Sequence, residues 1–441
     1  MCLLSPRLAH SGAPQSRTPN IIFILADDLG YGDLGCYGQK VIKTPNIDRL
    51  ASEGTRFTQC YAGSTVCAPS RAALMIGFHT GHARVRGNAN VPLRPEDTSV
   101  AEVLKQAGYT TGIVGKWGLG EPGSTGIPNK KGFDYWFGYL NQTHAHNYYP
   151  DYLWKNEEQY PLRQGEYSHD LFTREALDFV RRAREKPFFL YLAYTIPHAN
   201  NELFRKTGNG QEVPSDAPYS NENWSQPHKN FAAMITRMDG DVGKLMALLK
   251  ELGLDRNTVV FFSSDNGPHK EGGNDPEFFD SNGPLRGIKR DLYEGGIRVP
   301  MIARWPGRIK AGATSNQVWA FWDFLPTAAE IVGAKSPPGL DGISMLPALL
   351  GRGQKNHEFL YWEFHEGGFK QAVRMGDWKA VRLGPGKPLE LYDLRTDIGE
   401  KNNVTDKHPD VGAKIEQILK AARTESQAWP VRAVGPSPSS D

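Results

Sequence analysis

The run Cys67-Ala68-Pro69-Ser70-Arg71 places a nucleophilic thiol four residues before a cationic guanidinium. The apolar run 72–76 that follows predicts a helix, and on a helix Cys67 and Arg71 share one face because they are four residues apart. Pro69 suits the first turn, where its missing N–H would have no partner in any case. An anion at Cys67 would meet free helix-end amides and a guanidinium. Cys67 is therefore the candidate reaction centre, although a lone cysteine before a helix is more commonly a core residue.

Two pairs of polar residues follow apolar runs elsewhere in the chain. Asp27-Asp28 comes after the run 20–26, and Asp265-Asn266 comes after the run 258–263. Their carboxylate and amide oxygens suit a hard divalent cation such as Ca²⁺, which oxygen ligands hold at about 2.3–2.6 Å. A single Asp-Asp pair could equally form a turn or cap a helix. Two such pairs at two strand ends predict a metal site.

The run 67–71 resembles the sulfatase signature C-x-P-S-R, and further matches extend over almost the whole chain. They are Asp27-Asp28, Gly115-Lys116-Trp117, Pro197-His198, Asp265-Asn266-Gly267, Gly287-Ile288-Lys289 and the run 293–300. The resemblance implies a type I sulfatase of the alkaline-phosphatase-like superfamily, similar to bacterial arylsulfatases and carbohydrate sulfatases. In that family a formylglycine-generating enzyme oxidises the cysteine before folding to formylglycine (3-oxoalanine), an aldehyde whose hydrate attacks sulfur.

The resemblance also implies a role for each matched residue. Formylglycine at Cys67 would be the nucleophile and a metal ligand, with Arg71 steadying its hydroxyls. The other calcium ligands would be Asp27, Asp28, Asp265 and Asn266. Lys116 and Lys289 would bind sulfate oxygens, and His198 would protonate the departing alcohol. These roles cover what cleavage of a sulfate monoester needs, because a site must neutralise the sulfate oxygens, present a nucleophile and protonate the leaving group.

The chain departs from the family pattern near Lys116. Many sulfatases have G-K-W-H-L-G where this chain has Gly118, so a histidine that usually contacts the formylglycine is missing and the base for the second step is unassigned. His82, His144 and His146 are the candidates to replace it, and each could instead contact substrate or be structural. Ile76 and Phe78 stand where the family usually has Thr and Arg, which bears on how efficiently Cys67 matures.

The substrate is predicted by analogy alone. The loop 141–154 carries His and Asn side chains together with Tyr148, Tyr149, Tyr152 and Trp154, a mixture that suits stacking on sugar rings and equally suits a packed aromatic cluster. With the run 117–120, this loop is similar to that of bacterial carbohydrate sulfatases, some of which act on galactose-type sugars. A sulfated glycan is therefore the expected substrate.

Three other functions stay open at this point. A formylglycine-dependent phosphodiesterase or phosphonate monoester hydrolase of the same superfamily would use nearly the same residues. A catalytically silent, sulfatase-like glycan-binding protein would keep Cys67 unmodified, with Gly118 marking the lost chemistry, although the intact metal and lysine set argues against it. A cysteine-dependent hydrolase has the least support, because no motif for thiolate attack lies near Cys67.

The elements that must position these residues alternate between strands and helices. Buried strands are expected at 20–26, 111–115, 188–193 and 258–263, and helices at 47–53, 99–107, 168–184 and 230–252. This alternation predicts an α/β fold, and the resemblance makes it an alkaline-phosphatase-like sandwich with a large, mostly parallel central sheet flanked by helices. Ligands of such sheets gather beyond the carboxyl ends of the strands, where the matched residues follow the apolar runs. The stretches 199–227 and 267–286 are expected to be long loops over that edge.

The chain is expected to divide into a large and a small domain. Residues 18–354 would form the catalytic domain, and 355–432 a small α+β subdomain with strand-like runs at 359–362 and 372–381 and a helix at 409–424. The segment 1–17 is expected to be a disordered start or a signal remnant, and 433–441 a disordered tail.

Composition excludes several classes of function. The 441 residues are 39% hydrophobic and 23% charged, which is typical of a folded globular chain. The formal charge of +2 comes from 51 basic and 49 acidic residues without a basic stripe, so neither nucleic acid nor an anionic membrane is an expected partner. No apolar run approaches the roughly 18 residues of a membrane span. The four cysteines are too few for a disulfide framework. The resemblance implies a periplasmic or secreted location, although Pro6 and Arg7 make the first residues a poor signal peptide.

Overall fold

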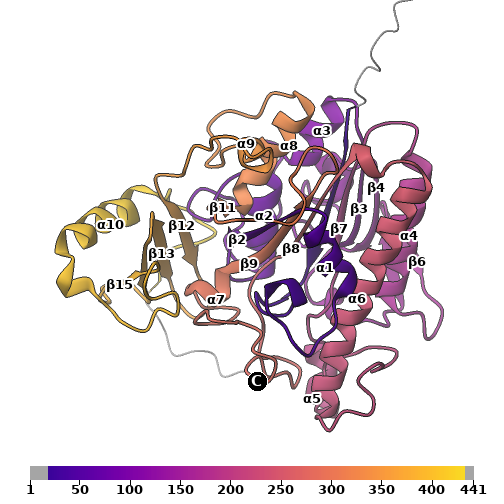
Figure 1. The fold of residues 1–441 in the computed structure, drawn as a ribbon, viewed down its shortest axis with the longest axis horizontal. Helices are drawn as coiled ribbons and strands as arrows, with labels where there is room; N and C mark the ends of the chain where they lie inside the picture. The colour runs from indigo at the N-terminus through magenta and orange to yellow at the C-terminus, as the bar shows by residue number, and fades with distance from the viewer. Residues whose placement is uncertain (1–17, 433–441) are drawn as a thin grey trace, which may run out of the picture.

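A computed structural model describes residues 18–432 of the chain. Over that range a large mixed sheet lies between two layers of helices, and a smaller domain packs against one end (Figure 1). The segments 1–17 and 433–441, which the sequence predicts to be disordered, lie outside the described residues.

The central sheet has 11 strands within residues 18–432. In spatial order they are β10 (Ala313–Ser315), β2 (Thr55–Tyr61), β9 (Arg298–Arg304), β8 (Thr258–Ser264), β1 (Asn20–Ala26), β7 (Phe188–Ala193), β3 (Thr110–Lys116), β4 (Tyr135–Tyr139), β5 (Tyr152–Lys155) and β6 (Glu158–Pro161), and β11 (Trp319–Ala320) pairs with β2. The middle strands β8, β1, β7, β3 and β4 are parallel, whereas β9, β5 and β6 pair in the antiparallel sense with their neighbours. Because the middle strands run parallel to one another, their carboxyl ends lie at the same edge of the sheet.

Strand β1 shows why the middle strands appear as unbroken apolar runs. All seven of its residues are buried. Ile21, Phe23 and Leu25 face one hydrophobic core, and Ile22 and Ile24 face another. A strand covered by helices on both faces has no solvent-facing side, so the alternation of polar and apolar residues disappears.

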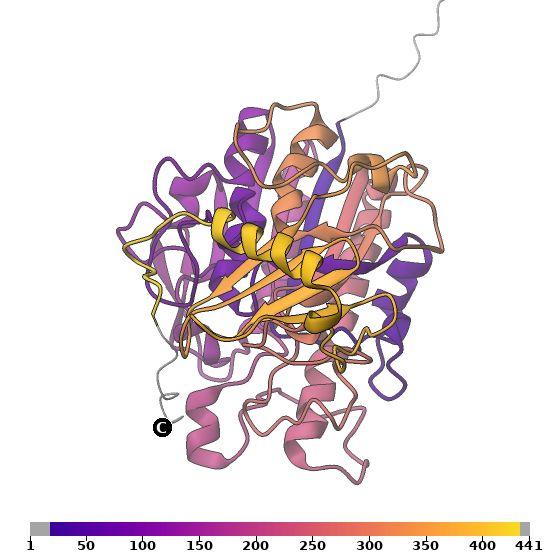
Figure 2. The ribbon, with the colours of Figure 1, turned by 90° about the vertical axis from the view of Figure 1, so that its left-hand side faces the viewer.

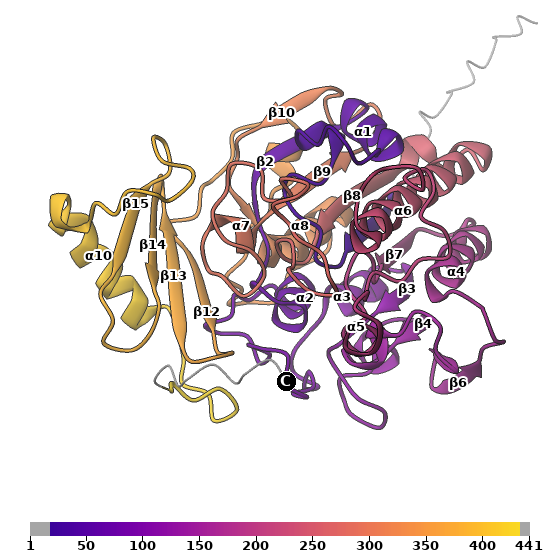
Figure 3. The ribbon, with the colours of Figure 1, turned by 90° about the horizontal axis from the view of Figure 1, so that it is seen from below.

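The helices form one layer on each face of the sheet. Helices α2 (Cys67–Ile76), α3 (Val100–Gln106) and α8 (Phe324–Val332) supply side chains to the first core. Helices α1 (Pro45–Ser52), α4 (Ser168–Ala183) and α6 (Gln226–Glu251) supply side chains to the second. Seen from below, the layer of α6 and α4 lies on the opposite side of the sheet from α2 (Figure 3).

The smaller domain is an antiparallel sheet of β12 (Leu360–Phe364), β13 (Lys370–Met375), β14 (Trp378–Arg382) and β15 (Glu390–Asp393) with helix α10 (Pro409–Ala421). Figure 2 shows α10 lying across this sheet, where Ile415 and Leu419 meet Val373 in one hydrophobic cluster. The other face packs against the large domain, where Trp362 contacts the core around Tyr61. The two sheets therefore share a continuous apolar boundary.

The predicted fold class is confirmed, and the predicted strands and helices match the observed ones with small shifts at their ends. The largest shift is in α6, which begins at Gln226 rather than at residue 230. The prediction of an unbroken loop over 199–227 is wrong at helix α5 (Asn201–Thr207). None of the α5 residues is buried, so α5 offers no apolar periodicity to detect. Three further helices, α7 (Glu294–Ile297), α8 and α9 (Leu346–Leu349), were not predicted.

Candidate active site

The carboxyl ends of β1 and β8 bring the two polar pairs together. In the parallel register of these strands Ala26 stands beside Ser264, so Asp27-Asp28 and Asp265-Asn266 leave the sheet side by side. The Asp28 backbone N–H donates to Asp265 Oδ1 at 3.0 Å, and Asn266 Nδ2 donates to Asp28 Oδ1 at 2.7 Å. Asp28 has a φ of 64°, a left-handed conformation that costs a non-glycine residue energy. The edge of the sheet thus gathers three carboxylates and one amide in a buried position.

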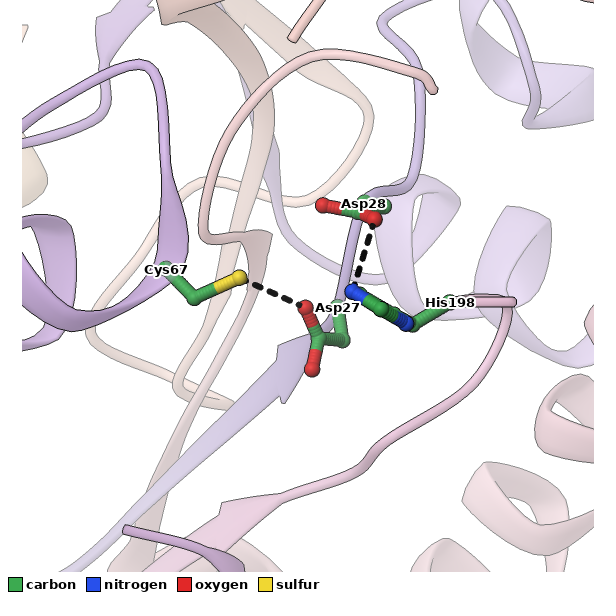
Figure 4. Close-up of side chains that lie close together, drawn as sticks. All are labelled: Asp27, Asp28, Cys67 and His198. Atoms are coloured by element: carbon green, nitrogen blue, oxygen red, sulfur yellow. Dashed lines mark hydrogen bonds and ion pairs between the residues drawn. The ribbon is translucent and has the colours of Figure 1, made fainter. Parts of the chain in front are cut away.

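Helix α2 delivers Cys67 to the same edge. The preceding residue, Val66, is extended, and the helix begins at Cys67 itself. Cys67 is 1% exposed, and its Sγ lies 3.3 Å from Asp27 Oδ1 (Figure 4). Asp27, Asp28, Cys67 and His198 place one potential ligand atom each within 4.8 Å of one another. Residue 67 therefore faces the predicted metal ligands directly.

Three buried cations surround these carboxylates. Arg71 donates from Nε and Nη2 to Asp265 Oδ2 at 3.0 and 2.8 Å. Lys116 Nζ, at the end of β3, donates to Asp27 Oδ2 at 2.7 Å. Lys289 Nζ donates to Asp28 Oδ2 at 2.8 Å. Each carboxylate has a cation against it, which compensates its burial.

His198 follows β7, and its ring lies beside Asp28 and Lys289. Its Nδ1 is 2.7 Å from the Ala199 carbonyl oxygen, so Nδ1 carries the proton and donates it there. Its Nε2 lies 3.1 Å from Lys289 Nζ and 3.5 Å from Asp28 Oδ2. Burial and the charge of Lys289 lower the pKa of His198 to about 3. The Nε2 lone pair is therefore directed into the site.

The carboxylates of the site titrate differently because their neighbours differ. Burial alone would raise the pKa of Asp27, but Lys116 and Arg71 together outweigh it and lower that pKa. For Asp28, Lys289 likewise outweighs burial and lowers the pKa. Burial and the adjacent Asp27 raise the pKa of Asp265 to about 7, despite its contact with Arg71. Asp265 is thus the carboxylate of the three whose charged form is least favoured in the absence of a metal.

The donor set fits a hard divalent cation. Three carboxylates converge with Asn266, whose Oδ1 is buried and has no hydrogen-bond partner within residues 18–432. Oxygen ligands of this kind are those that Ca²⁺ takes. Three cations already face the three carboxylates. A bound divalent cation would therefore leave the site positive, which suits an anionic substrate.

Comparisons with known proteins identify the family. The sulfatase family model matches residues 19–334, and a model for the C-terminal part of N-sulphoglucosamine sulphohydrolase matches residues 288–426. The N-acetylgalactosamine-6-sulfatase of Canis lupus familiaris is 36% identical over 86% of this chain and 74% of its own. The chain belongs to the sulfatase family. The predicted sulfuric ester hydrolase is thereby confirmed.

Two further relatives match this sulfatase over nearly their full lengths. The N-acetylgalactosamine-6-O-sulfatase of Bacteroides thetaiotaomicron is 30% identical over 95% of this chain and 96% of its own. The crystal structure of Ps i-CgsB in complex with k-i-k-neocarrahexaose superposes with a TM-score of 0.83 at 32% identity, covering 94% of this chain and 95% of that chain. A phosphonate monoester hydrolase of Agrobacterium radiobacter shares the fold with a TM-score of 0.66 at 20% identity, covering 92% of this chain and 95% of that one.

Among the helices of residues 18–432, none has the length and apolarity to span a membrane.

The three candidate histidines of the sulfatase lie in different surroundings. His146 stacks on His198 with ring centroids 4.8 Å apart, and its Nδ1 is 3.0 Å from Glu202 Oε2. Burial and the charge of Lys116 lower the pKa of His146. His144 instead packs between aromatic rings, with ring centroids 4.9 Å from Tyr139 and 4.6 Å from Tyr152.

His82 belongs to a second cluster of the sulfatase. Its Nδ1 is 2.9 Å from Asp341 Oδ1, and its ring stacks on His79 at 4.6 Å. His79 Nδ1 accepts a hydrogen bond from the Gly81 N–H. The structure thus brings His146 to the predicted catalytic cluster and gives His82 and His144 other partners.

The backbone conformation at position 118 favours the glycine found there over a histidine. Gly118 has a φ of +79°, which favours glycine, and a Cβ built on it would lie 2.2 Å from Gln142 Nε2. A side chain at position 118 would require this side chain to move, and its Nε2 atom is buried and has no hydrogen-bond partner in the described chain. Gln142 therefore occupies the space that a residue at 118 would need.

Sequence reasoning missed two carboxylates beside the cluster. Glu271 Oε2 lies 3.3 Å from Lys289 Nζ, and Oε1 accepts from Arg290. Glu202 of α5 bonds His146 as described above. Both residues lie in the stretches predicted to be loops over the sheet edge. The signal available for Glu271 was its position five residues after Asn266, in the loop that follows β8.

Proposed function

We propose that this sulfatase hydrolyses a sulfate monoester on a carbohydrate, with residue 67 as the nucleophile and Ca²⁺ bound by Asp27, Asp28, Asp265 and Asn266. The observation that carries the proposal is the convergence of Cys67 with three carboxylates and three cations at one buried edge. When present, formylglycine at residue 67 would supply a hydrate to attack sulfur, and Ca²⁺ would neutralise charge on that hydrate and on the sulfate.

The chain's own residues supply the remaining functions. Lys116 and Lys289 are the cations we assign to the sulfate oxygens, and each is at most 5% exposed, so their charge acts in a poorly solvated site. Arg71 holds Asp265 and also lies 3.3 Å from Asp27, which fixes both carboxylates behind residue 67.

His198 is the group we assign to proton transfer. Its Nδ1 proton is committed to the Ala199 carbonyl, so Nε2 is the atom that can hold and release a proton toward the leaving alcohol. The Nε2 atom also lies next to Lys289, so proton transfer would take place beside the bound sulfate.

A galactose-type glycan is the substrate class we propose. Its support is the name of the relatives, N-acetylgalactosamine-6-sulfatases, which match over most of the chain. The similar Ps i-CgsB was crystallised with a neocarrahexaose. We assign His146 to the substrate-facing wall, because its ring stacks on that of His198. We further propose maturation by a formylglycine-generating enzyme and a periplasmic or secreted location, which cell fractionation would test.

The test combines mass and turnover. The protein is co-produced with a formylglycine-generating enzyme, and the peptide spanning Cys67 is weighed while sulfate release from an aryl sulfate and from sulfated galactose-type oligosaccharides is followed with and without Ca²⁺. The aldehyde mass with calcium-dependent sulfate release is expected, and Cys67→Ala is the control. Faster release from matched phosphate or phosphonate esters would favour the phosphohydrolase. Unmodified Cys67 without turnover would overturn the catalytic role and leave a glycan-binding protein.

A further inference from the structure

Helix α2 lacks a cap of its own at the end that carries residue 67. The first N–H groups of a helix have no partners inside it, and a side chain usually accepts from one of them. Val66, which precedes the helix, has no polar side-chain atom and makes no such bond. Asn88 supplies it from another segment, because its Oδ1 accepts from the Ala68 N–H at 3.0 Å. This bond is made to the peptide group that joins residue 67 to residue 68.

The loop that carries Asn88 is fastened to the smaller domain by a buried ion pair. Arg86 Nη1 lies 2.7 Å from Glu363 Oε1, and the two side chains are 2% and 0% exposed. The same nitrogen donates to the Thr424 carbonyl at 2.9 Å. The Thr424 N–H in turn donates to the Gly81 carbonyl at 3.0 Å. Charge and backbone bonds thus join 81–86 to the segment that follows α10.

Trp429 also packs against this loop, at Gly87, the residue before Asn88. Its indole Nε1 donates to the Arg84 carbonyl at 3.0 Å, and the residue is only 7% exposed. A Cβ built on Gly87 would lie 2.6 Å from the indole ring, so only a glycine lets the ring lie this close to the backbone. The indole therefore packs directly against the backbone of the residue that precedes Asn88.

We propose that Asn88 is a positioning residue for the nucleophile, and that the segment 424–432 of the smaller domain clamps Asn88 in place through Trp429. The proposal rests on the proposed function, in which residue 67 carries the nucleophile. Reaction rates fall steeply when a reacting atom moves from its in-line position, and a helix that loses its cap frays first at that end. The smaller domain thereby contributes to catalysis through the position of residue 67.

The first experiment replaces the accepting oxygen. Asn88→Leu removes the acceptor at similar volume, and Asn88→Asp retains it. We expect Asn88→Leu to lower kcat by roughly fivefold to tenfold with KM changed less than twofold, because the lost cap is worth about 1 kcal/mol. Asn88→Asp should restore most of kcat. Equal kcat in Asn88→Leu and wild type would overturn the role of Asn88, as would an equal loss in both variants.

The second experiment tests the clamp by a double-mutant cycle. Gly87→Ala places a methyl group against the indole, so kcat should fall. In a Trp429→Ala background, which itself lowers kcat, the added methyl has room, and Gly87→Ala should cost less than half of the factor it costs in wild type. Independent, multiplicative effects would show that Trp429 and the Asn88 loop do not act together, and would overturn the clamp.

Two controls separate this inference from the proposed function. The aldehyde content at residue 67 is measured by mass in every variant and should equal that of wild type, because the family oxidises the cysteine before folding. Each variant's thermal midpoint shows that it is folded. Wild type without aldehyde or sulfate release would refute the proposed function. Active wild type with unaffected variants would refute only the positioning role.

Discussion

The buried carboxylate of Glu363, in β12, should contribute strongly to the stability of the contact between the two domains. It is 0% exposed and bonds Arg86 Nη1 at 2.7 Å and Arg423 Nε at 3.0 Å. His365 Nε2 lies 3.0 Å from Oε1 and the Tyr361 hydroxyl donates to Oε2 at 3.0 Å. Burial would raise the pKa of Glu363, but the His365 bond and the Arg86 charge outweigh it and lower the pKa from 4.5 to about 2.

The expected loss follows from this pKa. A lowering of about 2.5 units at 1.36 kcal/mol per unit corresponds to roughly 3 kcal/mol of folding free energy. Removing one partner of a buried ion pair independently costs about 3–5 kcal/mol. Glu363→Gln should therefore lower the free energy of unfolding by about 3 kcal/mol at pH 7. Because the folded-state pKa is the lower one, the contribution is present above about pH 4.5 and disappears as the pH falls toward 2.

The assay is denaturant unfolding followed by tryptophan fluorescence at several pH values between 7 and 3. Glu416→Gln is the matched control, because Glu416 pairs with Arg382 on the surface with its side chain 37% exposed. A surface pair should cost less than about 1 kcal/mol. The gap between wild type and Glu363→Gln should shrink as the pH falls below 4.5. A loss of unfolding free energy at pH 7 no larger than that of the control would refute the reasoning. So would a difference between wild type and Glu363→Gln that does not change with pH.

Three further predictions concern the site. Lys289→Met should lower kcat/KM for sulfate release by about 10²–10³, because its charge would meet the sulfate oxygens, and a loss below tenfold would contradict that role. Chelation should abolish activity and lower Tm, and added Ca²⁺ should raise Tm in a concentration-dependent way, so a Tm that ignores Ca²⁺ would argue against the metal site. His82→Ala should leave kcat unchanged, because His82 contacts Asp341 rather than the cluster at Cys67, and a large loss of kcat at unchanged Tm would show that His82 acts in catalysis.

The middle of the sheet could be predicted from the chain because burial on both faces leaves a clear record in sequence. The run 20–26 is apolar at nearly every position since no side of β1 meets water. Strand β2 (Thr55–Tyr61) was missed because its residues form neither an apolar run nor a regular alternation, and three of them are only partly buried. Helix α5 was missed for the same kind of reason, since it buries none of its residues. Secondary structure that does not bury a regular face leaves little pattern to detect.

The sequence by itself determined the family and its candidate residues, because the chemistry of a sulfate ester demands particular side chains next to strand ends. Only the tertiary structure decided how the departures from the family pattern are accommodated. Gln142 fills the space beside Gly118, and His82 is paired with Asp341, 259 residues away in the chain. Asn88 bonds the first turn of α2, and Trp429, near the other end of the chain, packs against the neighbouring Gly87. Contacts between residues so far apart depend on the packing of whole elements, and local residue patterns carry no record of them.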